Sequence, residues 1–306
     1  MSLVSLFKGK GASGFGYGST AEDVTRDLNL RGRTVLVTGS NSGIGLETVR
    51  VLGLRGARVL AAARTEEKAR QAVSGFSGEF VPVACELSDP KSVRACVAAV
   101  KKQAPKLDAL ICNAGIMALP KLERAFGYEL QFFTNHIGHF QLVTGLLDAL
   151  AEKGRVVMLS SAAHASAPRV GIEFDNLGGD KGYSPWTAYG QAKLANLLFA
   201  KELAKRLAGS GKTANAVHPG VIATNLTRNV PFVAQVAFKA VAPLGLKSAA
   251  QGAATQVYVA THPSLESVSG EYFADCNVAR STRASRDPVL AERLWEESER
   301  IVAGLA

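Results

Sequence analysis

From Arg33 onward, short runs of apolar and β-branched residues alternate with longer amphipathic segments. The runs lack the polar–apolar alternation of a half-exposed sheet, and continuous apolar strands separated by helices are typical of a parallel sheet covered by helices on both faces. Right-handed crossovers then restrict the chain to a doubly wound α/β topology. The expected strands are Thr34–Thr38, Arg58–Ala63, Phe80–Cys85, Leu107–Cys112, Arg155–Leu159 and Thr213–Val217, and the expected helices are Ile44–Arg55, Glu66–Val73, Pro90–Lys102, Lys121–Leu150 and Thr187–Leu207.

One pattern runs through the whole chain, without an internal repeat or a low-complexity linker. We therefore predict a single domain of the Rossmann type over residues 31–306. Residues 1–30 are expected to form a flexible N-terminal arm folded over this body, because the first twenty residues are rich in Gly and Ser and contain no acid. An acid-poor leader is also compatible with an organelle address such as a plastid. No apolar run approaches the roughly 18 residues that span a bilayer, so no transmembrane segment is expected.

The composition argues against several classes of function. Lys and Arg exceed Asp and Glu by nine, yet no five basic residues are consecutive, so a nucleic-acid-binding arm is not expected. The histidines lack ligand spacing beside an acid on one helix face, so we expect no metal. The four cysteines lack CxxC spacing, which predicts buried free thiols and a reducing, cytoplasmic compartment; they are Cys85, Cys96, Cys112 and Cys276.

A glycine-rich segment lies directly between the first expected strand and the first expected helix. A pyrophosphate needs close approach of the backbone and unpaired amide groups, and glycines at a helix N-terminus provide both. A bare tight turn is the alternative, but the complete strand–helix–strand unit around the segment favours a dinucleotide site. The expected phosphate loop is Gly39, Ser40, Asn41, Ser42, Gly43, Ile44 and Gly45, after Thr38.

Arg64 follows the second strand, about twenty residues beyond the glycines. A site for NAD requires an acid at this strand tip to bind the ribose 2′-hydroxyl, whereas an arginine accommodates a 2′-phosphate through charge-assisted hydrogen bonds. We therefore predict NADP(H) as the cofactor. Two alternatives remain at this point: Glu66 or Glu67 turns toward the ribose, or Arg64 is only a solvated surface residue.

Tyr189 and Lys193 are four residues apart in an expected helix, so the phenol and the ammonium share one face. A free tyrosine has a pKa near 10, and a neighbouring positive charge lowers that pKa, which suits acid–base work near neutral pH. Upstream, the strand that ends at Leu159 delivers Ser160 and Ser161 to its carboxyl end, where ligands bind in open α/β sheets. We expect these side chains to form one site.

Five motifs in this order resemble the short-chain dehydrogenase/reductase superfamily. The resemblance covers the chain from Arg31 to the C-terminus and is strongest for the retinol-dehydrogenase branch, through Thr134–Phe140, Lys193–Asn196 and Ser269–Phe273. Gly11–Phe15 and Ser19–Val24 are also similar to the plastid inner-envelope member of that branch. The five motifs are Thr38-Gly-x-x-x-Gly-x-Gly45, Asn113-Ala-Gly115, Ser161, Tyr189-x-x-x-Lys193 and Pro219-Gly-x-x-x-Thr224.

The resemblance implies the roles of four catalytic residues. Tyr189 is expected to be the general acid that protonates a carbonyl oxygen, and Lys193 to hold the nicotinamide ribose and lower the pKa of Tyr189. Ser161 is expected to hydrogen-bond the substrate oxygen, although its unusually long spacing from Tyr189 leaves Ser160 as a substitute. Asn135 is expected to anchor a water that relays protons to Lys193; a core amide that bends its helix is the alternative.

The resemblance also implies further cofactor contacts after the third, fourth and sixth strands. Glu86 stands where the superfamily usually has Asp, so its side-chain contact with the adenine is in doubt, while Leu87 is expected to pack on the ring. The remaining expected contacts are Asn113, Ala114 and Gly115 beside the adenine ribose, and Pro219, Gly220, Ile222 and Thr224 around the carboxamide and pyrophosphate.

In the superfamily, the segment corresponding to residues 225–247 covers the active site. Its apolar content favours a lipophilic aldehyde or ketone, similar to retinal, or the corresponding alcohol; core packing or a dimer contact is the alternative. The expected pocket walls are Met117, Trp186 and Phe232, beside Ser161. The resemblance implies a homodimer or homotetramer, and it leaves open peripheral membrane contact and a catalytically quiet NADP(H)-sensing assembly protein.

Overall fold

The computed structural model describes residues 8–222 and 246–305. Within these residues, eight strands form one sheet in the order β10-β9-β8-β7-β4-β1-β2-β3, parallel throughout except for the antiparallel pair β9–β10. A separate small hairpin pairs β5 with β6. The strands are β1 Thr34–Thr38, β2 Arg58–Ala63, β3 Glu79–Ala84, β4 Leu107–Cys112, β5 Arg124–Ala125, β6 Tyr128–Glu129, β7 Leu150–Leu159, β8 Thr213–His218, β9 Tyr272–Ala274 and β10 Asn277–Val278.

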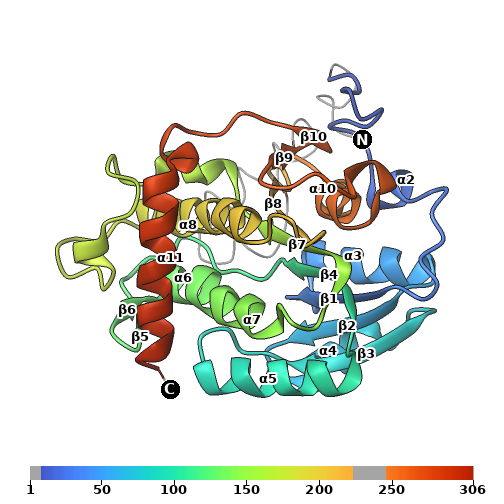
Figure 1. Ribbon diagram of the computed structural model, residues 1–306, viewed down its shortest axis with the longest axis horizontal. Coiled ribbons are helices and arrows are strands. Elements are labelled where there is room, and N and C mark those ends of the chain that lie inside the picture. The colour runs from blue at the N-terminus through green and yellow to red at the C-terminus, as the bar shows by residue number, and fades with distance from the viewer. Residues whose placement is uncertain (1–7, 223–245, 306) are drawn as a thin grey trace.

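Helices cover both faces of this sheet (Figure 1), which confirms the predicted doubly wound Rossmann-type fold. On β1, Leu36 faces a core shared with α5, α7, α8 and α11, whereas Val35 and Val37 face a second core shared with α2, α3, α4 and α10. The helices are α2 Ala21–Val24, α3 Gly43–Leu54, α4 Glu66–Val73, α5 Pro90–Gln103, α6 Leu130–Phe132, α7 Gly138–Leu146, α8 Pro185–Arg206, α10 Ala249–Thr261 and α11 Pro288–Ala303.

The bounds predicted for a single long helix, Lys121–Leu150, are wrong at both ends. Phe126 and Gly127 have φ values of 52° and 84°, so the chain turns there in the β5–β6 hairpin instead of entering a helix. The helical segment begins only at Leu130, passes through a π-helical turn, Phe133–Ile137, and ends with α7. Leu150 then starts β7, five residues before the expected strand.

The described part of the predicted N-terminal arm, residues 8–30, packs onto α10 and the β9–β10 edge. Ala21 and Val24 of α2 are buried in the core, and Phe15 packs edge-on against Tyr258 of α10 with ring centroids 5.5 Å apart. Asn277 hydrogen-bonds the arm at the Ser13 amide and the Phe15 carbonyl. These contacts place residues 8–30 over the folded body, where the arm was expected to lie.

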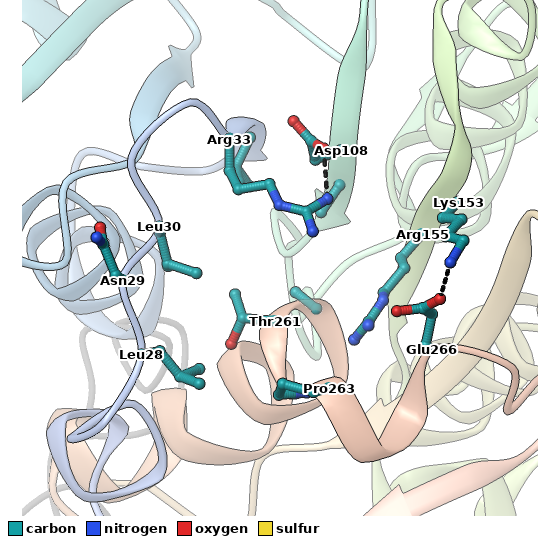
Figure 2. A pocket seen from close by; sticks show the side chains of 13 residues that line it. Leu28, Asn29, Leu30, Arg33, Asp108, Lys153, Arg155, Thr261, Pro263 and Glu266 are labelled. Carbon is teal, nitrogen blue, oxygen red and sulfur yellow. Dashed lines mark hydrogen bonds and ion pairs between the residues drawn. The ribbon is translucent and has the colours of Figure 1, made fainter.

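Arg155 is a buried cation at the amino edge of the sheet, opposite the candidate site. It lies beside a cavity of about 120 Å³ (Figure 2). Its Nη1 donates to the Val259 and His262 carbonyls at the end of α10, at 3.2 and 2.8 Å. Around it, Arg33 pairs with Asp108 and Lys153 with Glu266. Asp108 and Glu266 are thus paired with cations, and Arg155 is bonded to the carbonyls at the end of α10. We infer that these charges stabilise the fold.

Replacing Arg155 with methionine is expected to lower the free energy of unfolding by about 1–3 kcal/mol, because the buried Val259 carbonyl loses its side-chain donor and the His262 carbonyl keeps only the Leu265 amide. Arg33→Ala is the matched control in the same cavity, since its side chain is 56% exposed and exposed ion pairs contribute less than about 1 kcal/mol. Urea denaturation of both variants measures the difference. Equal stability losses would contradict this role of Arg155.

Candidate functional site

A cavity of about 420 Å³ opens at the carboxyl ends of β1, β2, β3, β4 and β7. Ligands of open α/β sheets bind at this edge. Most of the predicted cofactor residues meet in this cavity, although they come from four different loops. Its walls are Gly39, Asn41, Ser42, Gly43, Ile44, Gly45, Ala63, Arg64, Cys85, Glu86, Leu87, Ser88, Asn113, Ala114, Gly115, Ile116, Met117, Leu130, Thr134 and Leu159.

The glycine-rich turn leaves the space that a pyrophosphate requires. Gly39 and Gly43 have φ values of 68° and 57°, which residues other than glycine rarely adopt. A Cβ atom on Gly45 would lie 2.1 Å from the Gly39 carbonyl oxygen, so only glycine fits there. No side chain caps α3 at Ser42, and Ser42, Gly43 and Ile44 line the cavity, so the uncapped start of α3 borders it. Ser40 is different: its buried hydroxyl donates to the Ala62 carbonyl at 3.0 Å and holds the turn to β2.

The Asn113–Gly115 turn forms the floor of the cavity beside this loop. The Asn113 amide donates to the Thr38 carbonyl at 2.8 Å, and the Ala114 amide donates to the Thr38 hydroxyl at 3.0 Å. Thr134, a lining residue that sequence reasoning missed, has a buried hydroxyl without a hydrogen-bond partner among the described residues. Buried polar atoms without partners are rare, so this hydroxyl fits a site built for a polar ligand.

The tip of β2 presents a positive side chain to the cavity. Arg64 is exposed and lines the cavity, whereas Glu66 pairs with Arg70 and Glu67 accepts a hydrogen bond from Gln71, both within α4. Neither glutamate is a lining residue, so Arg64 is the charged side chain that the tip of β2 presents to the cavity.

After β3, Glu86 and Leu87 also line the cavity. Glu86 accepts hydrogen bonds from the amide and the hydroxyl of Ser88, at 3.2 and 2.9 Å. Leu87 is buried against Gly138 of α7, where an added Cβ would lie 2.3 Å from the Leu87 carbonyl oxygen. Ser88, in the same turn, therefore fixes the Glu86 carboxylate, and Leu87 packs against α7.

Tyr189 and Ser161 come together at the carboxyl end of β7. The two hydroxyls are hydrogen-bonded, and the Ser161 hydroxyl also accepts from the Ala163 amide at 3.2 Å. Ser160 is turned away: its hydroxyl donates to the Lys193 carbonyl at 2.7 Å inside the core. The geometry thus places Ser161, and not Ser160, beside the phenol.

Lys193 is buried beneath the tyrosine. Its ammonium donates to the Leu159 carbonyl at 2.9 Å and lies 5.7 Å from the centre of the Tyr189 ring. Burial lowers the pKa of Lys193 to about 8 and raises the pKa of Tyr189 to about 12, against a smaller lowering by the Ser161 hydrogen bond. The lowered tyrosine pKa expected from the helical spacing is therefore wrong for the protein alone, because burial outweighs the lowering of the pKa by the Ser161 hydrogen bond.

Asn135 lies in the π-helical turn Phe133–Ile137. Such turns inside α-helices are frequently found at functional sites. Its amide bonds both backbone groups of Ile116, accepting from the N–H at 2.8 Å and donating to the carbonyl at 2.9 Å. A Cβ atom on Gly115 would lie 3.1 Å from Asn135 Oδ1 and 3.4 Å from Lys193 Nζ. Asn135 and Lys193 therefore approach the same face of this turn.

The described residues of the loop after β8, including the predicted Pro219, Gly220 and Ile222, do not line this cavity. Gly220 has a φ of 94°, and a Cβ there would lie 2.6 Å from the side chain of the buried Lys247. Ile222 forms a β-bridge with Lys247 and contacts Gly252. Pro219 precedes them in this loop, whereas the predicted residues Thr224 and Phe232, and nearly all of the predicted lid 225–247, lie outside the described residues.

Two predicted substrate residues occupy different positions around the site. Met117 lines the cofactor cavity, whereas Trp186, at the start of α8, is 51% exposed and lies edge-on to Tyr189 with ring centroids 6.3 Å apart. Trp186 thus forms an apolar outer border next to the phenol. In the described parts of the chain, no group of three His, Cys, Asp or Glu side chains is placed to hold a metal ion, and no helix is long and apolar enough to cross a membrane.

The doubly wound sheet, the glycine-rich loop and the Tyr189–Lys193 pair define a dinucleotide-binding α/β protein. The model of the short chain dehydrogenase family matches residues 33–232. The chain belongs to this family of NAD(P)-binding oxidoreductases. It is 42% identical to Short-chain dehydrogenase TIC 32 A, chloroplastic, of Brassica napus over the full length of both chains. It is also 42% identical to mouse Retinol dehydrogenase 12, covering 90% of this chain and 87% of that one. The predicted superfamily and branch are confirmed.

Solved structures agree with this assignment. An uncharacterised protein of Mycobacterium paratuberculosis superposes with a TM-score of 0.76 at 34% identity, covering 94% of this chain and 98% of that one. A short chain dehydrogenase from Burkholderia cenocepacia, solved in complex with NADP, gives a TM-score of 0.63 at 25% identity, covering 80% and 96%.

Proposed function

We propose that the protein is an NADP(H)-dependent carbonyl reductase that acts on a lipophilic aldehyde or ketone of the retinal type. The observation that carries the proposal is the joint position of Tyr189, hydrogen-bonded to Ser161 and above Lys193, at the edge of a cavity with a glycine-lined phosphate loop. The bound cofactor would supply the hydride. The names of the retinol dehydrogenases among the relatives support an apolar substrate.

In this proposal, the side chains of the chain itself handle the proton. Burial keeps Tyr189 protonated, since its pKa is raised to about 12, so the phenol can donate to a carbonyl oxygen. Ser161 orients that oxygen through a second hydrogen bond, and Lys193 supplies a buried positive charge behind the phenol. The exposed face of Trp186 offers an apolar border for a hydrocarbon substrate.

The direct test is turnover of a panel of short and long aldehydes with NADPH, followed by the loss of absorbance at 340 nm, a property of the cofactor. We expect oxidation of NADPH with retinal-like aldehydes and slower oxidation with short polar ones. Tight NADPH binding without turnover of any aldehyde would instead favour an NADP(H)-sensing assembly protein on the same fold.

Arg64→Ala is expected to weaken NADPH binding by about 10- to 100-fold, the loss of a charge-assisted contact, and to leave NADH binding nearly unchanged. Fluorescence titration with both cofactors measures the ratio. Arg70→Ala is the matched control, because Arg70 is an exposed arginine of the adjacent α4 that pairs with Glu66. Unchanged NADPH affinity in Arg64→Ala would exclude the 2′-phosphate contact.

The rate of reduction is expected to fall on the alkaline side with the pKa of Lys193, about 8, and not with that of Tyr189, about 12. Lys193 carries its charge below its pKa, so kcat/KM for NADPH, which reports groups of the free enzyme, is constant near pH 7 and decreases above about pH 8. Circular dichroism at each pH checks that the protein remains folded. A profile that stays level to pH 10 would refute this assignment.

A further inference from the structure

We propose that His139 is a positioning residue of this site, holding Asn135 and the Asn113–Gly115 turn in a single arrangement through a neutral imidazole. His139 is fully buried in α7, one helical turn after Asn135, and does not line the cavity. The inference rests on the proposed function, because it assigns His139 to the same reaction. Its evidence is a closed path of hydrogen bonds.

The two ring nitrogens of His139 have different partners. Nδ1 lies 2.9 Å from the Asn135 carbonyl oxygen, and Nε2 lies 2.9 Å from the Thr38 hydroxyl. A carbonyl oxygen only accepts, so Nδ1 carries the proton and Nε2 accepts the proton of the Thr38 hydroxyl. The geometry thus assigns one tautomer to the ring.

Thr38 connects His139 to the Asn113–Gly115 turn at the floor of the cavity. Its hydroxyl accepts the Ala114 N–H at 3.0 Å, and two residues further along the chain the Asn135 amide holds both backbone groups of Ile116. The path from Asn135 through His139, Thr38 and Ala114 to Ile116 therefore returns to Asn135. Gly115 lies inside it, against Asn135 and the ammonium of Lys193.

The π-helical turn explains why a side chain is needed at this point. A π turn shifts the regular pattern of helical hydrogen bonds, and the His139 ring supplies a donor to the Asn135 carbonyl. Burial, together with the charge of Lys193 and against the hydrogen bond to Asn135, lowers the pKa of His139 to about 4, so the ring stays neutral near pH 7. Neutrality preserves Nε2 as an acceptor for Thr38.

His139→Phe keeps a ring of similar size but removes both hydrogen bonds, and we expect it to lower kcat by about 10- to 100-fold, as small misplacements of catalytic groups do. KM for the aldehyde should change little.

Thr38→Val removes one link of the path and should lower kcat, and Thr38→Ser, which keeps the hydroxyl, should restore it. His136→Phe is the matched control, because that buried imidazole, in the adjacent π-helical turn, bonds Ser298 of α11. A loss of kcat in His136→Phe equal to that in His139→Phe would overturn the proposal.

Nitrogen NMR of the histidine rings tests the network without turnover. We expect a proton on Nδ1 and none on Nε2 of His139 in the parent protein, and the opposite tautomer would overturn the proposal. The kcat measurements separate the role proposed for His139 from the proposed carbonyl reductase activity. If Tyr189→Phe is inactive while His139→Phe matches the parent, only the role of His139 is wrong; if Tyr189→Phe matches the parent, the proposed function itself fails.

Discussion

Tyr189→Phe is expected to lower kcat for aldehyde reduction by about 10²- to 10⁴-fold, the contribution of a positioned general acid. The ring and its packing against Trp186 remain, so only the hydroxyl that bonds Ser161 is lost. Burial keeps this phenol protonated, so the variant loses the proton that the phenol would donate. Steady-state kinetics with NADPH and a saturating aldehyde measure the effect.

The control for this prediction is Tyr258→Phe on α10, a phenol hydrogen-bonded to Ser264 at the opposite edge of the sheet. It should retain the parental kcat. NADPH binding by Tyr189→Phe, measured by fluorescence titration, should stay close to that of the parent protein. Equal turnover by Tyr189→Phe and the parent would rule out a phenol as the proton donor.

Gly45→Ala is expected to weaken NADPH binding by about 100-fold or more, because the phosphate loop requires close backbone approach. The added methyl group would lie 2.1 Å from the Gly39 carbonyl oxygen and 2.5 Å from Asn113 Nδ2, so the loop or the Asn113–Gly115 turn has to move. Calorimetric titration with NADPH gives the affinity, and thermal unfolding in the absence of cofactor gives the cost to the fold.

Gly75→Ala is the matched control, because a Cβ atom there has nothing within 4 Å and its φ is not in the left-handed region. It should bind NADPH as the parent does. If Gly45→Ala also binds NADPH with parental affinity, the glycine-rich turn is not the pyrophosphate site.

Much of the fold was predictable because its signals are local. The continuous apolar runs of β1, β2 and β4 identified a parallel sheet, and the glycine-rich turn marked its carboxyl edge. The edge strands β9 and β10 were missed because each has three residues or fewer, too short for a pattern. The β5–β6 hairpin was missed because positive φ at Phe126 is imposed by the fold and not by residue type.

The candidate site was predictable in its residues but not in its electrostatics. Helical spacing placed Tyr189 and Lys193 on one face, yet it could not reveal that both are buried, and burial reverses the expected shift of the Tyr189 pKa. The choice between Ser160 and Ser161 depended on which hydroxyl faces the core, and the bonds of His139 depended on a π-helical turn. Such facts arise from tertiary packing.

Residues 8–30 are synthesised well before the residues that they contact. The hydrogen bond between Ser13 and Asn277 spans 264 residues of sequence, and Phe15 packs on Tyr258. Contacts of such long range form late and slow the search for the native state. The growing chain therefore cannot close this edge until Asn277 has emerged, and the interval leaves Phe15 uncovered and accessible to chaperones.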